Sequence, residues 1–240
     1  PAPEGPQGIR DSTPRLIHIH PGRFVSSLMN KFICPLVALL SATAILIPVQ
    51  ADTLQPLEVE FPPPFLIGTP VPIKVPHLEA PNTRPPEVLV PGDVSNLAAG
   101  KEVTSSSDFL IIGELDFVTD GEKFSEEGYF VELDTELQWV QIDLGQESEL
   151  YAAAVWHFHS QKRVYHDVIV QVSNDPDFTE NVTTVFNNDH DDSAGMGRGS
   201  EKAYIETHKG KLIPLGRTKG RYIRLYSQGN SSNALNHYVE

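Results

Sequence analysis

Three short segments in the middle of the chain decide its fold: QWVQIDLG at residues 138–145, ELYAAAVWHFH at 149–159 and RVYHDVIVQVSNDPDF at 163–178. Apolar and polar residues alternate within each segment, which is the period of a half-buried β-strand. In the first segment Val140, Ile142 and Leu144 share one face. Gly145 ends this segment, and Pro176 stops the third because proline keeps the preceding residue out of helical geometry. The pattern predicts three consecutive strands at the centre of an antiparallel β-sandwich.

The same alternation, continued into RYIRLY at residues 221–226, assigns seven apolar side chains to the core. They are Val140, Ile142, Leu144, Val168, Val170, Ile223 and Leu225. Further strands are predicted at residues 182–186, 204–207, 220–226 and 237–240, and no stretch of useful length has a helical period.

The segments WVQIDLG, VIVQVSNDPDF and RYIRLY, in that order, resemble the discoidin domain, also known as the coagulation factor 5/8 type C family. This family is similar to galactose-binding-like sugar modules of bacteria. The resemblance covers residues 94–240 and implies an all-β fold, an antiparallel jelly-roll sandwich. It also implies a closing strand that continues past Glu240, so that this sequence holds only part of that strand. Members of the family are overwhelmingly non-catalytic.

Composition limits the partners of the chain. Its 240 residues carry 18 basic and 32 acidic side chains, a formal charge of −14, without clusters of lysine or arginine. Such a chain is repelled by nucleic acid and by anionic membrane surfaces, so neither is expected as a partner. Cys34 is the one cysteine in the sequence, which excludes a disulfide within the chain.

Shifts in composition divide the chain into four parts. Residues 1–28 are rich in proline at the start and read as a leader without structure. Residues 29–51 combine Lys31, an apolar run at 32–49 and Ala51, which predicts a cleavable signal peptide, with a transmembrane anchor as the alternative. Residues 52–91 hold eleven prolines and form an extended arm or linker, part of which packs on the sandwich. Residues 92–240 form the discoidin-like domain.

By the same resemblance, Asp120 and Gly121 form the loop that binds a structural calcium ion. Calcium prefers six to eight oxygen ligands, and a glycine lets the chain turn tightly around the ion. The resemblance implies that Asp120 and Glu240 each supply a carboxylate oxygen and that loop carbonyl groups complete the shell. Glu122 departs from the common Asp-Gly-Asn form of this loop, and an ordinary Asp-Gly turn is the alternative.

Six polar or aromatic residues near predicted strand ends are the candidates for ligand binding: His157, His159, Tyr165, Asn188, Asp189 and Arg224. Sugars need a planar apolar surface together with fixed donors and acceptors for their hydroxyl groups. Several alternatives stay open. Residues 187–193 are typical of a solvated loop, of a sugar-contacting loop or of a second cation-binding loop. His157 and His159 are typical of a metal-binding face or of structural hydrogen bonding. Arg224 is typical of a carbohydrate clamp or of cation–π support.

These observations predict a secreted or periplasmic module that is not an enzyme and that binds a glycan or an extracellular polysaccharide through loops at one end. The sequence has no Gly-x-Ser-x-Gly motif and no glycine-rich phosphate loop that would indicate catalysis. A structural or adhesive module with a surface protein as its partner is the second hypothesis. A metal-dependent enzyme that uses His157 and His159 is the third.

Overall fold

The computed structural model describes residues 53–80 and 83–240. The predicted leader, the predicted signal peptide and Cys34 lie outside these residues. Within the described part the elements, in chain order, are β1 (Leu54–Pro56), β2 (Leu89–Pro91), β3 (Glu102–Ser105), the 3₁₀ helix η1 (Leu115–Thr119), β4 (Val131–Leu133), β5 (Gln138–Val155), β6 (Ile169–Ser173), β7 (Thr183–Asn187), β8 (Lys211–Ser227) and β9 (Asn236–Tyr238). No helix in this part has the length and hydropathy needed to span a membrane.

The main layer is a five-stranded sheet in the order β3-β5-β8-β6-β7, in which every pair is antiparallel. β4 and β9 form a second, two-stranded sheet, and β1 pairs with β2. Val131, Leu133 and Tyr238 from the small sheet pack in the same buried cluster as Val140 and Leu225 of the large one. The fold is therefore an all-β antiparallel sandwich, as the alternation predicted.

The predicted core residues occupy one face of the large sheet. Val140 lies opposite Leu225, and Ile142 lies opposite Ile223. Five of the seven are buried, and Ile142 and Ile223 pack against the same cluster while only partly buried. The free energy of this burial is on the order of 1.5–3 kcal/mol for each large aliphatic side chain. The two-residue alternation along the strands therefore predicted correctly which side chains face the core.

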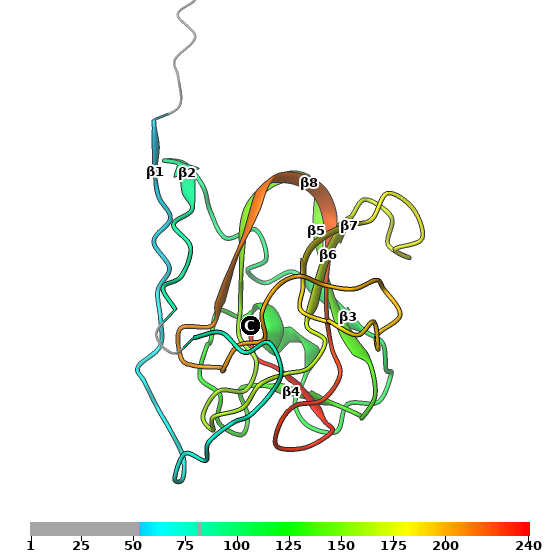
Figure 1. Ribbon diagram of the computed structural model, residues 1–240. Coiled ribbons are helices and arrows are strands. Elements are labelled where there is room, and N and C mark those ends of the chain that lie inside the picture. The colour runs from blue at the N-terminus through cyan, green and yellow to red at the C-terminus, as the bar shows by residue number, and fades with distance from the viewer. Residues whose placement is uncertain (1–52, 81–82) are drawn as a thin grey trace, which may run out of the picture. The chain divides into compact units, whose positions relative to one another are not determined.

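Gly145 is not the end of a strand, contrary to the prediction. β5 continues to Val155, and its ladder with β8 shifts register between Asp143 and Ser148. Gly145 has a φ of 86°, a left-handed conformation that glycine adopts without steric cost. The glycine therefore marks an irregularity at which β5 and β8 arch together over one end of the sandwich (Figure 1).

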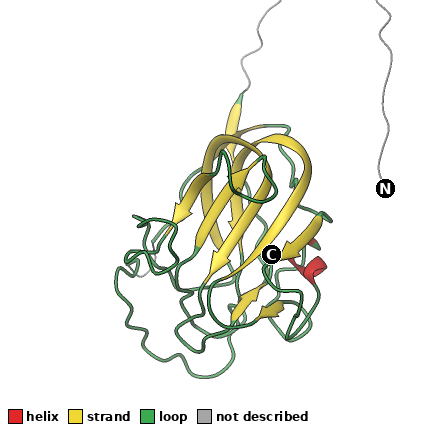
Figure 2. Ribbon diagram, turned by 90° about the vertical axis from the view of Figure 1, so that its right-hand side faces the viewer, coloured by secondary structure: helices red, strands yellow, loops and turns green. Residues whose placement is uncertain are grey.

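Many of the loops gather at the end opposite the arch (Figure 2). The predicted strand at residues 204–207 is absent, since only Ala203 forms a bridge there, to Leu78. The proline-rich arm, here residues 57–80, contacts the sandwich through backbone hydrogen bonds. Ile67 N–H donates to the Ser160 carbonyl oxygen at 2.6 Å, and Glu79 N–H donates to that of Ala203 at 2.8 Å. These hydrogen bonds hold the arm against the sandwich.

Candidate functional site

All six predicted ligand residues are buried, with exposed fractions that range from 0% for His157 and Asp189 to 9% for Arg224. The expectation that they form an exposed polar surface is therefore wrong. Strand-end position and polarity suggested exposure, but each of these side chains is held by partners inside the domain. Whether any of them contacts a ligand stays a prediction.

His157 and Tyr165 belong to a buried polar cluster. His157 Nδ1 lies 2.8 Å from Glu206 Oε1, and the His157 ring stacks on Tyr165 with the centroids 4.3 Å apart. The Tyr165 hydroxyl is 2.9 Å from His237 Nδ1. Burial, together with Arg163 and His157, lowers the pKa of His237 to about 3, so that its ring is neutral. His237 Nε2 accordingly donates to Glu132 Oε2 at 2.8 Å.

His159 belongs to a different network, since its Nε2 lies 2.9 Å from the carbonyl oxygen of Lys123. Among the described residues, the grouping of three potential metal ligands is Asp167, Asp189 and Asp191, which includes neither histidine. The structure thus does not bring His157 and His159 together as a metal-binding face. One nitrogen of each ring is instead held by a hydrogen bond within the domain.

Asn188 and Asp189 organise the loop that follows β7. Asn188 Oδ1 accepts a hydrogen bond from the Val168 N–H at 2.8 Å. The Asp189 carboxylate accepts four backbone N–H groups, from residues 191–194. Short polar side chains commonly stabilise turns in this way. These two residues hold a loop in shape and present almost no surface to solvent.

Arg224 lies on the outer face of the large sheet, apart from the other five. Its guanidinium carbon is 4.1 Å from the Trp139 ring centroid and 4.2 Å from that of Phe178. Nε donates to Gln141 Oε1 at 2.8 Å, and Nη2 donates to the Pro176 carbonyl oxygen at 3.1 Å. An arginine held between two rings supports the sheet face through cation–π attraction.

The predicted calcium residues do come together. The Gly121 N–H donates to Glu240 Oε2 at 3.2 Å, and Asp120 Oδ1 accepts the N–H of Glu122 at 2.7 Å. Burial above all raises the pKa of Glu240 to about 7; the charges of Asp120 and Glu122 contribute to this rise, and the Gly121 hydrogen bond and Lys123 oppose it. A cation beside Glu240 would relieve this concentration of negative charge. Calcium binding at these carboxylates stays a prediction, and the Asp120–Glu122 hydrogen bond is also that of an ordinary turn.

A shallow pocket of about 360 Å³ opens among the loops and the arm. Its polar side is formed by exposed side chains of two loops, Gln161 and Lys162 before β6 and Ser231 and Ser232 after β8. Its other side is the stretch of arm at residues 66–75, which is mostly apolar, with Pro70, Val71 and Pro72, but also carries Lys74. We call this the loop-end pocket.

Sequence reasoning missed the loop-end pocket. The polar runs SQKR at residues 160–163 and GNSSN at 229–233 are a signal for exposed loops. Nothing in the local sequence, however, shows that these two runs meet, or that the arm folds over them. The predicted residues His157, His159 and Tyr165 flank the first run but point inward.

The chain is similar to solved protein structures, whereas the comparisons of its sequence find no match. No protein-family model and no curated protein matches the chain. A carbohydrate-binding module, CBM32 of AlyQ in complex with 4,5-unsaturated mannuronic acid, is 22% identical, with a TM-score of 0.40 over 58% of this chain and 90% of that one. A chitosan-binding module from a chitosanase/glucanase of Paenibacillus sp. IK-5 is 22% identical, with a TM-score of 0.38 over 60% of this chain and 96% of that one.

A family 89 glycoside hydrolase from Clostridium perfringens is 18% identical, with a TM-score of 0.43 over 60% of this chain. The match spans 14% of the length of that enzyme.

Proposed function

We propose that the domain is a non-catalytic carbohydrate-binding module whose ligand occupies the loop-end pocket. The observation that carries the proposal is the pairing, within about 360 Å³, of exposed amide, ammonium and hydroxyl groups with an apolar wall of proline and valine. Pockets of this size and mixture are typical of small-ligand sites, in which a few polar groups fix the orientation of the ligand. The sequence resemblance to discoidin-like sugar modules supports the same class.

The chemistry of the pocket suits a sugar in particular. The flat faces of a pyranose ring carry C–H groups, which pack against apolar side chains such as those of Pro70 and Pro72. Its hydroxyl groups both donate and accept hydrogen bonds, as the Gln161 amide and the Ser232 hydroxyl also do. Lys74 and Lys162 add two positive charges, which favour a glycan that carries a carboxylate. We therefore propose an acidic glycan before a neutral one.

Removal of one neutral hydrogen bond should weaken binding about three- to tenfold, which corresponds to about 0.7–1.4 kcal/mol. We expect this loss for Gln161→Ala and for Ser232→Ala, measured by calorimetric titration with an acidic oligosaccharide identified on a glycan array. Ser232→Ala should leave the melting temperature unchanged because that side chain is exposed, whereas Gln161→Ala also removes the acceptor of a 2.9 Å hydrogen bond from Arg163 Nη2 and should lower it slightly. The proposal fails if no glycan on the array binds, or if both variants bind like the unaltered protein.

Gln146→Ala is the matched control for this titration. Gln146 is an exposed glutamine on β5, in the arch at the opposite end of the sandwich. Its substitution removes the same functional group without touching the loop-end pocket. Equal losses for Gln146→Ala and Gln161→Ala would mean that the binding measured is not located in the pocket.

We also propose that Asp120 and Glu240 bind calcium. At a hundredfold excess over the dissociation constant, binding stabilises a fold by about 2.7 kcal/mol, which raises the melting temperature by roughly 5–10 °C for a domain of this size. Asp120→Ala should abolish that rise.

Because the pKa of Glu240 is about 7 and only the ionised carboxylate binds the ion, the rise should fade as the pH falls through 7. Melting curves with calcium and with chelator at pH 8 and pH 5.5 measure both effects. Curves indifferent to calcium at pH 8 would remove the site.

A further inference from the structure

The stretch of arm that lines the loop-end pocket is attached to the sandwich at two points. At its start the Ile67 N–H donates to the Ser160 carbonyl oxygen, and past its end the Glu79 N–H donates to that of Ala203. Within the described part of the chain, residues 68–76 make no backbone hydrogen bond to the rest of the domain. The arm wall of the pocket, residues 66–75, lies almost entirely between the two points. We call residues 68–76 the strap.

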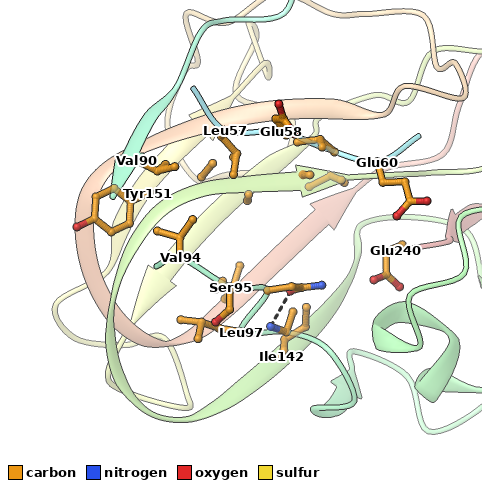
Figure 3. A pocket seen from close by; sticks show the side chains of 18 of the residues that line it. Leu57, Glu58, Glu60, Val90, Val94, Ser95, Leu97, Ile142, Tyr151 and Glu240 are labelled. Atoms are coloured by element: carbon orange, nitrogen blue, oxygen red, sulfur yellow. Dashed lines mark hydrogen bonds between the residues drawn. The ribbon is translucent and has the colours of Figure 1, made fainter. Parts of the chain in front are cut away.

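The part of the arm before the strap has contacts of its own. The Leu57 N–H donates to the Val88 carbonyl oxygen at 2.8 Å. Residues 55–60 line a groove beside β5, in which Leu57 and Glu60 lie on the arm side (Figure 3). These contacts do not involve the loop-end pocket. The strap therefore depends on the hydrogen bond at Ile67 and on the contacts at its far end.

The far end of the strap is held by side chains as well as by the backbone. The rings of His77 and His190 stack with their centroids 3.8 Å apart. His77 has a φ of 55°, a conformation that persists in a residue with a Cβ atom only where its surroundings hold it. The carboxylate of Glu79 forms an ion pair with the ammonium group of Lys211. The exposed fractions of the two side chains are 23% and 19%, so water screens the pair only in part.

Lys211 connects this end of the strap to the centre of the sandwich. It is the first residue of β8 and lies opposite Val155 of β5. Its Nζ atom is 4.7 Å from the centroid of the Tyr204 ring, which adds cation–π attraction. Neither Lys211 nor Glu79 lines the loop-end pocket. The pair can therefore affect the pocket only through the strap.

We propose that the ion pair of Glu79 and Lys211 positions the strap and thereby sets the affinity of the loop-end pocket for its glycan. This inference rests on the function proposed above. A site whose wall is in place in only a fraction of the molecules has an apparent dissociation constant raised in inverse proportion to that fraction. When the strap leaves, Pro70 and Lys74 leave with it, while Lys162 stays on its loop. The glycan then meets one ammonium group in place of two.

Hydrogen exchange at the Glu79 amide reports on the strap without any glycan. Lys211→Met keeps the aliphatic stem and loses the charge, and we expect the Glu79 amide to exchange at least tenfold faster in this variant. Lys219→Met loses the same charge at an exposed site of β8 in the arch and should have no effect. Gly113→Ala, which brings a Cβ atom within 2.1 Å of a backbone oxygen far from the strap, should also leave this amide unchanged, because the amide exchanges by local release. Unaltered exchange in Lys211→Met would overturn the proposal.

The effect on binding is measured by calorimetric titration with a trimer of galacturonic acid, a glycan that carries carboxylates. Lys211→Met should raise the dissociation constant about three- to tenfold, and Lys219→Met should not change it. Glu79→Lys should weaken binding further, because two ammonium groups then repel each other. The double variant Glu79→Lys with Lys211→Glu should restore both the affinity and the slow exchange. A double variant that restores neither would contradict the role of the pair.

The two measurements also separate the strap from the function on which it rests. If the trimer does not bind the unaltered chain, while the Glu79 amide exchanges faster in Lys211→Met, the result contradicts the proposed function and supports the strap. If the trimer binds the unaltered chain and Lys211→Met equally well, the result supports the proposed function and overturns the role of the strap.

Discussion

Glu206→Ala is expected to lower the free energy of unfolding by about 3–5 kcal/mol, the cost of removing one partner from a buried carboxylate–imidazole pair. Glu206 and His157 have fully buried side chains and lie 2.8 Å apart. Without the carboxylate, His157 Nδ1 would lose its hydrogen-bond partner where water does not reach, and the removed atoms would leave a cavity beside Tyr165. Urea unfolding at neutral pH measures the loss.

Two control variants test whether the loss of stability comes from the pair of His157 and Glu206 and not from the removal of any carboxylate. Glu206→Gln keeps the shape and one acceptor oxygen, so it should lose less than Glu206→Ala. Glu149→Ala removes the exposed ion pair with Arg217 and should change the stability little. A double-mutant cycle with His157→Ala should show strong coupling between the two positions. Additive losses in that cycle would mean that the pair does not act as a unit.

Gly113→Ala is expected to cost about 3–4 kcal/mol, the second largest effect. A Cβ atom at this position would lie 2.1 Å from the carbonyl oxygen of Phe130, which is backbone and has little freedom to move. The residue also has a φ of 80°, which strains any side chain that has a Cβ atom. The Glu132 N–H donates to the Ile112 carbonyl oxygen and the Ile111 N–H donates to that of Glu132, and these two hydrogen bonds fix the segments against each other. Thermal and urea unfolding of the purified variant would measure the cost.

Gly128→Ala is the matched comparison. Gly128 has a φ of 96°, but a Cβ atom there meets no atom within 4 Å. This variant therefore bears only the conformational strain, about 1 kcal/mol. The difference between the two variants isolates the steric contribution of the Phe130 carbonyl group. If both variants lost the same stability, the close approach of Gly113 to β4 would be incorrect.

The alternation of side chains was enough to predict the sandwich and its core. Val140, Val170 and Leu225 were assigned to the inner face because a strand has a period of two, and tertiary contacts did not alter that assignment. The prediction that a strand ends at Gly145 was wrong because glycine can either end a strand or permit an irregularity within one. Only the pairing of β5 with β8, which is not local, distinguishes the two cases.

The candidate site was harder to predict because polarity does not report exposure. His157 and Asp189 are polar and lie beside strand ends, yet both are fully buried. Glu206 holds Nδ1 of His157, and the backbone of residues 191–194 holds the Asp189 carboxylate. The groups that do reach solvent at the loop-end pocket, Gln161 and Ser232, lie far apart in sequence. Asp120 and Glu240 lie even further apart, and it was the resemblance to a family, not any local pattern, that joined them.

The ladder between β5 and β8 also has a consequence for how the chain folds. Gln138 pairs with Ser227, and the whole segment that carries β6 and β7 lies between these two strands in sequence. The central pairing of the large sheet must therefore close a long loop before it gains any contact energy. Folds dominated by such distant pairings form in milliseconds to seconds, and their unpaired strands stay exposed during that time.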